Sequence, residues 1–312
     1  MESSTLRLKD KVAVITGSGQ GLGKAIAMAY AAEGAKIVTN SRKPGTAGGD
    51  AETTVEEIQK AGGEAAYIYA DVSRFEDAEA IIQKAVSSLG RIDILVNNAG
   101  VDAPKMIWNM SEEEWDRCLN ASLKGAFSCS KFACVHMREQ KWGRIINCTS
   151  TAWLGTMGHV NYGAAKAGIV GLTRAVAREM GRYGVTCNAF SPLAATRMTA
   201  NEQVKAGLAK RLQAGIITQA QYDAAIDMPP PEGVAPMLVY LASDAASDIN
   251  GQVFHLEADK IGYYSEPAQI RTIYKDYKKE GFFSQEDLEK YIPQMLGSVY
   301  KNPAPAAKEE GR

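Results

Sequence analysis

The sequence predicts an α/β fold, in which a single doubly wound parallel sheet carries helices on both faces and is supplemented by a lid insertion and a C-terminal extension. Three observations predict it. Short apolar runs alternate with longer segments of helical pattern, which is typical of βαβ units. A glycine-rich turn follows the first of these runs directly. With 312 residues, 46% of them hydrophobic and 23% charged, the chain can bury a core of this size.

The alternation places the elements in order along the first 190 residues. A capping box at Ser111–Glu114 opens a long helical stretch that runs to Gln140. The other expected helices are 22–33, 52–60, 75–89 and 161–182, and the expected strands are 12–15, 37–38, 67–69, 94–96, 145–148 and 185–190. No second domain is needed to hold these elements.

Two stretches break the alternation. Residues 193–231 form an insertion of about forty residues rich in Ala, Gln and Lys, a length more typical of a functional lid than of a connector. The tail is too rich in aromatic residues for disorder, so we expect residues 261–300 to pack on the body or on a neighbouring subunit. Residues 301–312 have the composition of a flexible end. The predicted division is therefore 1–260 for the catalytic domain, 261–300 for the extension and 301–312 for the tail.

Composition excludes several functions. A formal net charge of -1 leaves no basic excess for nucleic acid. Residues 1–11 are polar and no run of about 18 apolar residues occurs, so we expect a cytoplasmic protein without membrane contact. The five cysteines form no CxxC pair, which favours free buried thiols. His136 and His255 lack ligand spacing, so no metal is expected.

The glycine-rich turn lies between the first strand and the first helix. Glycines are needed where a backbone turns tightly against a pyrophosphate, whose charge the free N–H groups of the helix N-terminus then meet. In this position the turn predicts a Rossmann-type dinucleotide site rather than a turn that merely tolerates glycine. The residues expected to bind the cofactor here are Gly17, Ser18, Gly19, Gln20, Gly21, Leu22 and Gly23.

The end of the second strand indicates which dinucleotide binds. An acidic residue there would hold a ribose 2'-hydroxyl, but this chain has Asn40, Ser41, Arg42 and Lys43. Without a carboxylate, and with Arg42 able to grip a 2'-phosphate beside Ser41, the sequence favours NADP(H), with NAD(H) possible. The alternative is that Arg42 and Lys43 are solvated loop charges.

Tyr162 and Lys166 are four residues apart at the start of a predicted helix and therefore share one face. Ser150 follows the preceding strand, so its hydroxyl reaches the carboxyl edge of the sheet, where ligands of such folds bind. A phenol becomes an acid/base near neutrality only if its pKa falls by about three units, or about 4 kcal/mol. One nearby ammonium can supply a term of that order, and the positive nicotinamide ring of a bound cofactor would add to it. Lys166 is therefore expected to lower the pKa of Tyr162 while Ser150 holds the substrate oxygen.

With these motifs the chain resembles the short-chain dehydrogenase/reductase family over roughly residues 8–256. The resemblance implies a ketone/alcohol oxidoreductase (EC 1.1.1.-) that forms a homo-oligomer, a dimer or tetramer. It also implies that Asp71 and Val72 contact the adenine and that Tyr162 and Lys166 contact the cofactor. The other cofactor contacts that it implies are Asn98, Ala99, Gly100, Pro192 and Thr196.

The chain departs from that family in three places. Seven residues after Trp115, where such enzymes usually carry an asparagine supporting a relay water, stands Ser122, taken here as a catalytic position. Twelve residues separate Ser150 from Tyr162 where thirteen is usual; Thr149 has the usual spacing, but Ser150 better matches the strand end. The usual Pro-Gly after the sixth strand is Pro192-Leu193.

The substrate prediction depends on a looser resemblance. The runs 123–125 and 196–199 and the long lid are similar to the hydroxyacyl-CoA dehydrogenase domains of multifunctional β-oxidation enzymes. His159 is either a substrate contact or an exposed loop residue. Several apolar residues belong to segments expected either to border the cleft or to pack the lid: Trp153, Leu154, Met157, Leu193, Met198 and Tyr222.

Three hypotheses follow for the function. The first is an NADP(H)-preferring oxidoreductase acting on a sizeable apolar substrate, such as a 3-oxoacyl or 3-hydroxyacyl thioester, a steroid or a cyclic alcohol. The second is a cofactor-binding, weakly catalytic partner subunit of an oxidoreductase complex. The third is a lyase or epimerase on the same fold.

Overall fold

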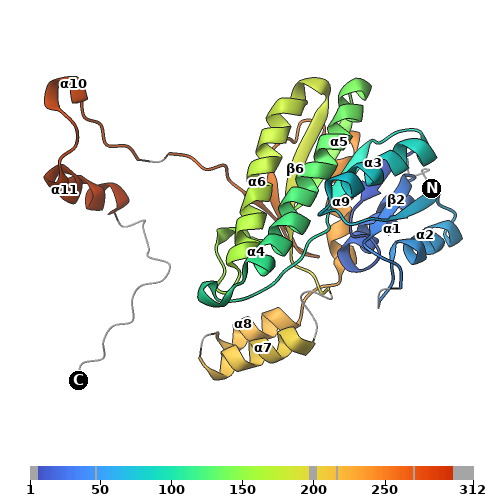
Figure 1. Cartoon of the computed structure of the whole chain (residues 1–312), viewed down its shortest axis with the longest axis horizontal. Coiled ribbons are helices and arrows are strands. Elements are labelled where there is room, and N and C mark those ends of the chain that lie inside the picture. The colour runs from blue at the N-terminus through green and yellow to red at the C-terminus, as the bar shows by residue number, and fades with distance from the viewer. Residues whose placement is uncertain (1–5, 46–47, 197–201, 216, 270, 298–312) are drawn as a thin grey trace. The chain divides into compact units, whose positions relative to one another are not determined.

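Among the described residues, eight strands form one sheet in the order β3-β2-β1-β4-β5-β6-β7-β8 (Figure 1). The computed structural model describes residues 6–45, 48–196, 202–215, 217–269 and 271–297. Neighbouring strands are parallel from β3 through to β7, and only β8 runs antiparallel to its neighbour. The strands are β1 (Val12–Ile15), β2 (Lys36–Ser41), β3 (Ala65–Tyr69), β4 (Ile94–Asn97), β5 (Gly143–Cys148), β6 (Val185–Pro192), β7 (Val253–Leu256) and β8 (Ile261–Tyr264).

The central strands are buried along almost their whole length because both faces of the sheet are covered. β1 and β4 are buried at every position, as expected for parallel strands between two helical layers. The helices are α1 (Gly21–Ala32), α2 (Ala51–Lys60), α3 (Phe75–Leu89), α4 (Glu112–Leu119), α5 (Gly125–Gln140), α6 (Val160–Met180), α7 (Glu202–Gln213), α8 (Gln219–Ile226), α9 (Ala235–Ala242), α10 (Tyr277–Glu280) and α11 (Gln285–Leu296).

Two apolar layers sandwich the sheet. On one face α1, α2 and α9 contribute to a cluster around Tyr30, whose hydroxyl donates to the Leu238 carbonyl at 2.9 Å. On the other face α3, α5 and α6 contribute to a cluster that contains Ile81, Cys129 and Met180. The predicted doubly wound parallel sheet with helices on both faces is thus confirmed, and so is the capping box of Ser111 and Glu114, which opens α4.

The secondary structure differs from the sequence-based prediction at two places. α4 and α5 are joined by a π-helical turn, η2 (Asn120–Lys124), where the sequence indicated one uninterrupted helical stretch. β8 extends the sheet by residues that the sequence division had placed in the extension, so the first compact unit runs to Tyr264.

The insertion and the extension each contain helices. α7 and α8 lie within the segment expected to be a lid, and residues 197–201 and 216 of that segment lie outside the described residues. The second compact unit, Ser265–Arg312, contains α10 and α11 and has its own contacts. Its Lys275 ammonium binds the Asp287 carboxylate at 2.6 Å, and the Tyr277 and Phe282 rings stack at 6.0 Å. The predicted flexible tail lies outside the described residues.

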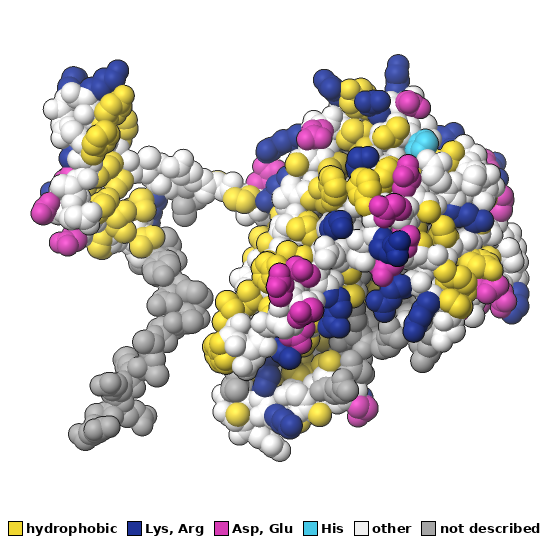
Figure 2. Space-filling model, in the orientation of Figure 1, with side chains coloured by type: hydrophobic (Ala, Val, Ile, Leu, Met, Phe, Trp, Pro, Cys, Tyr) yellow, Lys and Arg dark blue, Asp and Glu magenta, His cyan; other side chains and the backbone are white. Residues whose placement is uncertain are grey.

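Charges of both signs are interspersed on the face of the first unit that Figure 2 shows. Within the described part of the chain, no helix is long and apolar enough to cross a bilayer, and no cluster of three or more His, Cys, Asp or Glu side chains could hold a metal ion. All five cysteines, which lie in described segments, are unpaired thiols, and four of them are buried.

Candidate active site

A cavity of about 380 Å³ opens at the carboxyl ends of the parallel strands. It lies where the chain order of the strands reverses between β1 and β4, the place at which such sheets bind ligands. Every residue that the sequence assigned to the cofactor lines this cavity except Ser18, and so does Ser150. The remaining lining residues were not predicted: Asn40, Lys43, Gly49, Ala70, Val101, Ala121, Cys148, Thr149 and Ala194.

The glycine turn between β1 and α1 is packed too tightly for side chains. A Cβ atom on Gly19 would lie 2.6 Å from the Asp50 Cα at the start of α2, and Gly17 has φ +64. The first turn of α1 carries no acidic residue. The wall is therefore bare backbone at a helix N-terminus without opposing charge, which fits a pyrophosphate.

Ser18 lies behind this wall and does not face the cavity. It is fully buried, its hydroxyl donates to the Ile15 carbonyl at 2.7 Å, and it accepts from the Asn40 amide at 3.0 Å. It ties the ends of β1 and β2 together. Ser18 was expected to bind the cofactor, but it does not line the cavity and both hydrogen-bonding roles of its hydroxyl are used internally.

Asn40 is a residue that the sequence reasoning did not assign. Its side-chain carbonyl accepts from the Gly17 amide at 3.3 Å, and its amide donates to the Ala70 carbonyl at 3.0 Å. Asn98 acts similarly from β4, since its amide donates to the Thr16 and Gly17 carbonyls at 3.0 and 3.2 Å. The side-chain carbonyl of Asn40 and the side-chain amide of Asn98 therefore both hold the glycine turn in place.

The side chains at and after the end of β2 differ in whether their polar groups are already hydrogen-bonded within the protein. The Ser41 hydroxyl accepts from the Ala51 amide at 3.0 Å at the start of α2. Arg42 and Lys43 are exposed along the cavity, and no described residue forms an ion pair with Arg42. On the other side, the Asp71 carboxylate accepts from the amide and hydroxyl of Ser73 at 3.0 and 2.7 Å. Arg42 is thus available to a ligand phosphate.

Ser150, Tyr162 and Lys166 come together at the inner end of the cavity. Lys166 is 3% exposed; its ammonium donates to the Cys148 carbonyl at 2.6 Å and lies 5.4 Å from the centre of the Tyr162 ring. The Ser150 hydroxyl lies close enough to the Tyr162 phenol to lower its pKa slightly. Thr149, by contrast, is buried, and its hydroxyl donates to the Lys166 carbonyl at 2.8 Å. Of the two hydroxyls, that of Ser150 is therefore the one left to face the cavity.

The electrostatics of Tyr162 differ from the expectation. Burial raises the pKa of the Tyr162 phenol above its ordinary value, and the Lys166 ammonium offsets that increase only in part. The prediction named the right direction for the effect of Lys166, but in the chain without its cofactor burial outweighs that effect. It counted the attraction of Lys166 for a phenolate but not the cost of taking the phenolate out of water.

Ser122 lies in the π-helical turn η2, behind the loop that follows β4. It is 2% exposed, does not line the cavity, and its hydroxyl accepts from the Val101 amide at 3.3 Å. π-Turns within helices are frequent at functional sites. Here the turn brings a serine against the loop backbone rather than into the cavity.

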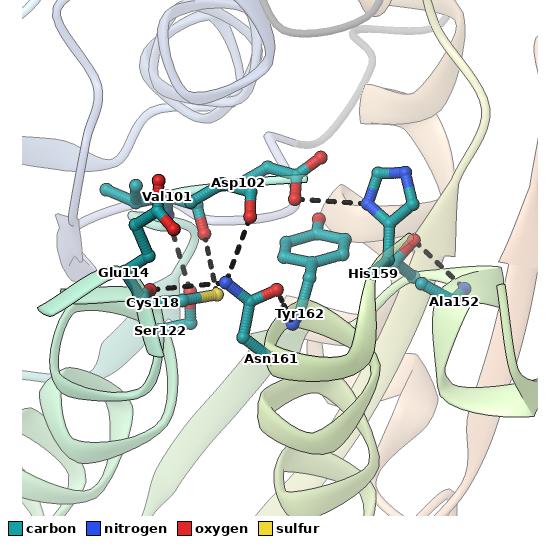
Figure 3. A network of polar contacts seen from close by, with 11 residues as sticks. Val101, Asp102, Glu114, Cys118, Ser122, Ala152, His159, Asn161 and Tyr162 are labelled. Carbon is teal, nitrogen blue, oxygen red and sulfur yellow. Dashed lines mark hydrogen bonds and ion pairs between the residues drawn. The ribbon is translucent and has the colours of Figure 1, made fainter. Parts of the chain in front are cut away.

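The sequence reasoning missed a polar pair beside Tyr162, formed by two residues that do not line the cavity (Figure 3). The His159 imidazole Nδ1 lies 3.1 Å from the Asp102 carboxylate, and its ring centre lies 6.2 Å from that of Tyr162. His159 therefore has a specific partner and is not merely an exposed loop residue. No sequence signal joined the two, because 57 positions separate them.

Asn161 was also missed, although it directly precedes Tyr162. It is fully buried, its amide donates to the carbonyls of Ala103 and Glu114 at 3.1 and 3.2 Å, and its carbonyl accepts from the Tyr162 amide at 2.8 Å. Asn161 thereby ties the start of α6 to the loop that carries Asp102.

The apolar residues expected at the cleft do not line the cavity. Trp153 packs edge-on against Tyr264 at 5.3 Å, and Leu154 and Met157 are 61% and 65% exposed. Leu193 and Tyr222 do not line it either, and Met198 lies outside the described residues.

Comparison with known proteins adds a family match and close relatives. Residues 11–206 match the family model described as short chain dehydrogenase. A hydroxyacyl-CoA dehydrogenase of Mycobacterium tuberculosis is 37% identical over 287 residues, covering 88% of this chain and 86% of that protein. The peroxisomal hydratase-dehydrogenase-epimerase of Saccharomyces cerevisiae is 39% identical over 303 residues, covering 95% of this chain but only 30% of that protein.

Two further matches extend over most of both chains. A 3-oxoacyl-[acyl-carrier-protein] reductase of Synechocystis is 39% identical over 257 residues, covering 81% of this chain and 98% of that protein. The solved structure of a short chain dehydrogenase from Mycobacterium avium superposes with a TM-score of 0.79 at 36% identity, covering 96% of this chain and 98% of that one.

Proposed function

Because the chain belongs to the short-chain dehydrogenase/reductase family and is an oxidoreductase, we propose that it interconverts a ketone and a secondary alcohol on an acyl thioester, with NADP(H) as the preferred cofactor. The observation that carries this proposal is the meeting of Ser150, Tyr162 and Lys166 with the glycine turn in one cavity. A dinucleotide along the turn and a carbonyl at Ser150 would then be neighbours.

Ser150, Tyr162 and Lys166 each have a defined role in this proposal. Ser150 donates a hydrogen bond to the substrate oxygen, and Tyr162 gives that oxygen a proton or takes one from it. Lys166 stabilises the phenolate form of Tyr162 and is close enough to the cavity to bind a ribose hydroxyl. A bound nicotinamide supplies the position that gives or accepts the hydride.

The preference for NADP(H) is supported by the end of β2. Arg42 and Lys43 are exposed there along the cavity wall, while the neighbouring Asn40 is buried and turned into the fold. A ribose 2'-phosphate would meet two cations and no carboxylate from residues 40–43. NAD(H) would lose this contact.

An acyl substrate is supported by the loops at the mouth. Lys105 and His159 form a parallel bridge that joins the loop after β4 to the loop before α6. Both loops carry exposed apolar side chains: Ile107 at 62%, Trp108 at 73%, Leu154 at 61% and Met157 at 65%. Such a rim suits a substrate with an apolar chain. Relatives named for 3-oxoacyl and hydroxyacyl thioesters point to the same class.

The test is a spectrophotometric screen of the purified chain. NADPH oxidation is measured with 3-oxoacyl-CoAs of increasing length, steroid ketones and cyclic ketones, and NADP⁺ reduction with the matching alcohols. Turnover that is highest with the thioesters supports the proposal. Turnover confined to steroids or cyclic ketones would replace the substrate class, and substrate consumption without a change in nicotinamide absorbance would indicate a lyase or epimerase.

The second candidate is the cofactor-binding, weakly catalytic partner subunit. The departures at Ser122 and Pro192-Leu193 favour it, whereas the packing of Ser150, Tyr162 and Lys166 favours an enzyme. Tight NADPH binding without turnover on any panel member would support this second candidate. Both candidates include a homo-oligomer and a lid formed by α7 and α8. The expected cytoplasmic location stays a prediction.

A further inference from the structure

The side chain of Asn161 directly precedes the tyrosine that we propose as the acid/base. Asn161 is fully buried and does not line the cavity. A carboxamide that is taken out of water in this way is costly unless both its amide and its carbonyl find hydrogen-bond partners. Asn161 finds such partners on three different segments of the chain, although it touches no part of the cavity.

The three partners of Asn161 lie in the loop after β4, in α4 and in α6. Its amide donates to the Ala103 carbonyl in the loop at 3.1 Å and to the Glu114 carbonyl in the first turn of α4 at 3.2 Å. Its side-chain carbonyl accepts from the Tyr162 amide at 2.8 Å. In Figure 3 dashed lines join the Asn161 side-chain nitrogen to the loop and to α4, and its oxygen to the backbone of Tyr162. One side chain therefore connects three segments.

The bond to the Tyr162 amide satisfies a group that α6 leaves without an acceptor. The first N–H groups of a helix have no intrahelical partner, and Tyr162 is the third residue of α6. His159 stands at the N-cap position, but its side chain forms no capping hydrogen bond. One residue after the tyrosine, the Gly163 amide donates to the His159 carbonyl at 2.7 Å. Asn161 thus supplies the acceptor that the helix lacks at Tyr162.

The segments to which the Asn161 amide binds are themselves fixed. Glu114 forms a capping box with Ser111, and its carboxylate binds the Lys105 ammonium at 2.9 Å. The Lys105 amide donates to the Gly158 carbonyl at 2.8 Å, in the loop that leads into α6. The loop after β4, α4 and the start of α6 are therefore joined in a closed set of contacts, to which Asn161 contributes three.

The position of the Tyr162 hydroxyl depends on the first turn of α6. The ring is rigid, so a shift of that turn moves the hydroxyl at the far end of the ring. The neighbouring functional groups are held elsewhere: the Lys166 ammonium donates to the Cys148 carbonyl of β5 at 2.6 Å, and Ser150 is the N-cap of the short helix η3 (Thr151–Leu154). A misplacement of about 1 Å can slow a reaction about 10²-fold. The contacts of Asn161 are thus placed where a small shift would affect the rate.

We propose that Asn161 is a positioning residue, which fixes the first turn of α6 and thereby places the Tyr162 hydroxyl relative to Ser150 and Lys166. This inference rests on the proposed oxidoreductase function. Asn161 itself touches neither the cavity nor any reacting atom. Its loss should therefore lower the rate of the chemical step and leave the binding of NADPH and of substrate nearly unchanged. A residue that only stabilises the fold would lower Tm without this selective effect on the rate.

Asn188 of β6 provides a matched control. It is 1% exposed, its amide donates to the Ile249 carbonyl at 2.7 Å, and its side-chain carbonyl accepts from the Gln252 amide at 3.0 Å. Asn188 therefore has the same kinds of partner as Asn161, but neither Asn188 nor these two partners line the cavity. Asn188→Ala should lower Tm by an amount comparable to Asn161→Ala and leave the site as it is.

The first test compares the variants by steady-state kinetics with the best substrate of the panel. Asn161→Ala should lower kcat about tenfold or more, with KM and the Kd for NADPH changed little, whereas Asn188→Ala should change none of the three. Asn161→Ser is a milder variant, because its hydroxyl can still accept from the Tyr162 amide but cannot replace both donors. Its kcat should lie between the other two, and it carries the test if Asn161→Ala does not fold. Equal losses of kcat in the Asn161 and Asn188 variants, or no loss in either, would overturn the proposal.

The second test does not need turnover. In protein labelled with ¹³C at the tyrosine Cζ atoms, the Tyr162 resonance is the one that disappears in Y162F. This resonance should shift in N161A and stay in place in N188A, and the Tyr162 amide should exchange faster with deuterated water in N161A only. A Tyr162 resonance and amide exchange rate that N161A leaves unchanged would refute the inference. If the full chain turns over nothing, the proposed function fails, and these spectra still decide whether Asn161 positions the phenol.

Discussion

The ammonium nitrogen of Lys166 lies 5.4 Å from the centre of the Tyr162 ring and donates a hydrogen bond of 2.6 Å to the Cys148 carbonyl. The backbone of β5 therefore holds the lysine, and the lysine acts on the phenol through its charge. This division explains why burial still dominates the pKa of Tyr162 in the chain by itself.

The first prediction removes the Tyr162 hydroxyl. Tyr162→Phe keeps the ring and loses only the proton donor, so hydride transfer should fall by at least about 10²-fold while NADPH affinity stays nearly the same. Steady-state kinetics and fluorescence titration of NADPH measure the two effects. Equal turnover in the variant would show that another group is the acid/base.

The second prediction concerns pH. Because the pKa of Tyr162 is raised, its phenol keeps its proton at neutral pH, and the protonated form is the one that donates to a ketone. The deprotonated form accepts from an alcohol. Ketone reduction should therefore keep its neutral rate up to about pH 10, the ordinary pKa of a phenol, while alcohol oxidation should increase over the same range. The measurement is kcat/KM in both directions between about pH 6 and pH 10. Oxidation that does not depend on pH would contradict the assignment.

The third prediction concerns cofactor choice. Arg42→Ala should weaken NADPH binding by about 1–3 kcal/mol, the strength of a charge-assisted contact, and leave NADH binding nearly unchanged. Lys43→Ala is the matched control from the next position and should have the smaller effect, because an ammonium lacks the planar fork of a guanidinium. Isothermal titration with both cofactors gives the comparison. An equal loss for NADPH and NADH would mean that Arg42 does not contact the 2'-phosphate.

The fourth prediction concerns the glycine turn. A Cβ on Gly19 would lie 2.6 Å from the Asp50 Cα, which is backbone and cannot rotate away. Gly19→Ala should therefore shift the turn or α2, lower Tm and weaken NADPH binding more than tenfold. Gly171→Ala in α6 is the control, because nothing lies within 4 Å of its Cβ position and alanine favours a helix. Unchanged binding in the Gly19 variant would show that the turn can adapt.

A feature could be predicted from the sequence when it depends on neighbouring residues, and was missed when it depends on residues far apart in the chain. β1 and the capping box of Ser111 follow from neighbouring residues, and the sequence located both. The parallel direction of the strands followed from the alternation of short apolar runs with helical segments. β8 was missed because its pairing with β7 depends on a reversal that no strong turn motif marks.

The candidate site shows the same division. The glycine turn and Ser150 follow strands and the Tyr162–Lys166 pair lies in α6, so each is a local motif, and all of them except Ser18 of the turn line the cavity. The internal role of Ser18 was not foreseen because its partner Asn40 becomes a neighbour only in the folded chain. Asp102 was missed for the same reason, since its partner is His159. The pKa of Tyr162 was misjudged for a related reason. Its burial depends on the packing of several segments, which a charge count over one helix does not contain.

The last prediction concerns Ser122, the position at which the chain leaves the family pattern. Its hydroxyl accepts from the Val101 amide at 3.3 Å, and a Cβ atom on Gly100 would lie 3.2 Å from it. An asparagine is larger than serine, and the site is 2% exposed, so the added amide has no solvent to enter. Ser122→Asn should therefore push the loop after β4 outward, disturb the Asp102–His159 pair and lower turnover.

Steady-state kinetics and Tm of Ser122→Asn decide the question, with Ser122→Ala as the matched control. The alanine variant loses one hydrogen bond but adds no volume, so it should retain more activity than the asparagine variant. A several-fold increase in turnover for Ser122→Asn would show instead that the position is a degraded relay that asparagine repairs. The packing of Ser122 against Val101 and Gly100 argues for the first outcome, because a side chain already filling its space leaves no room for a larger one.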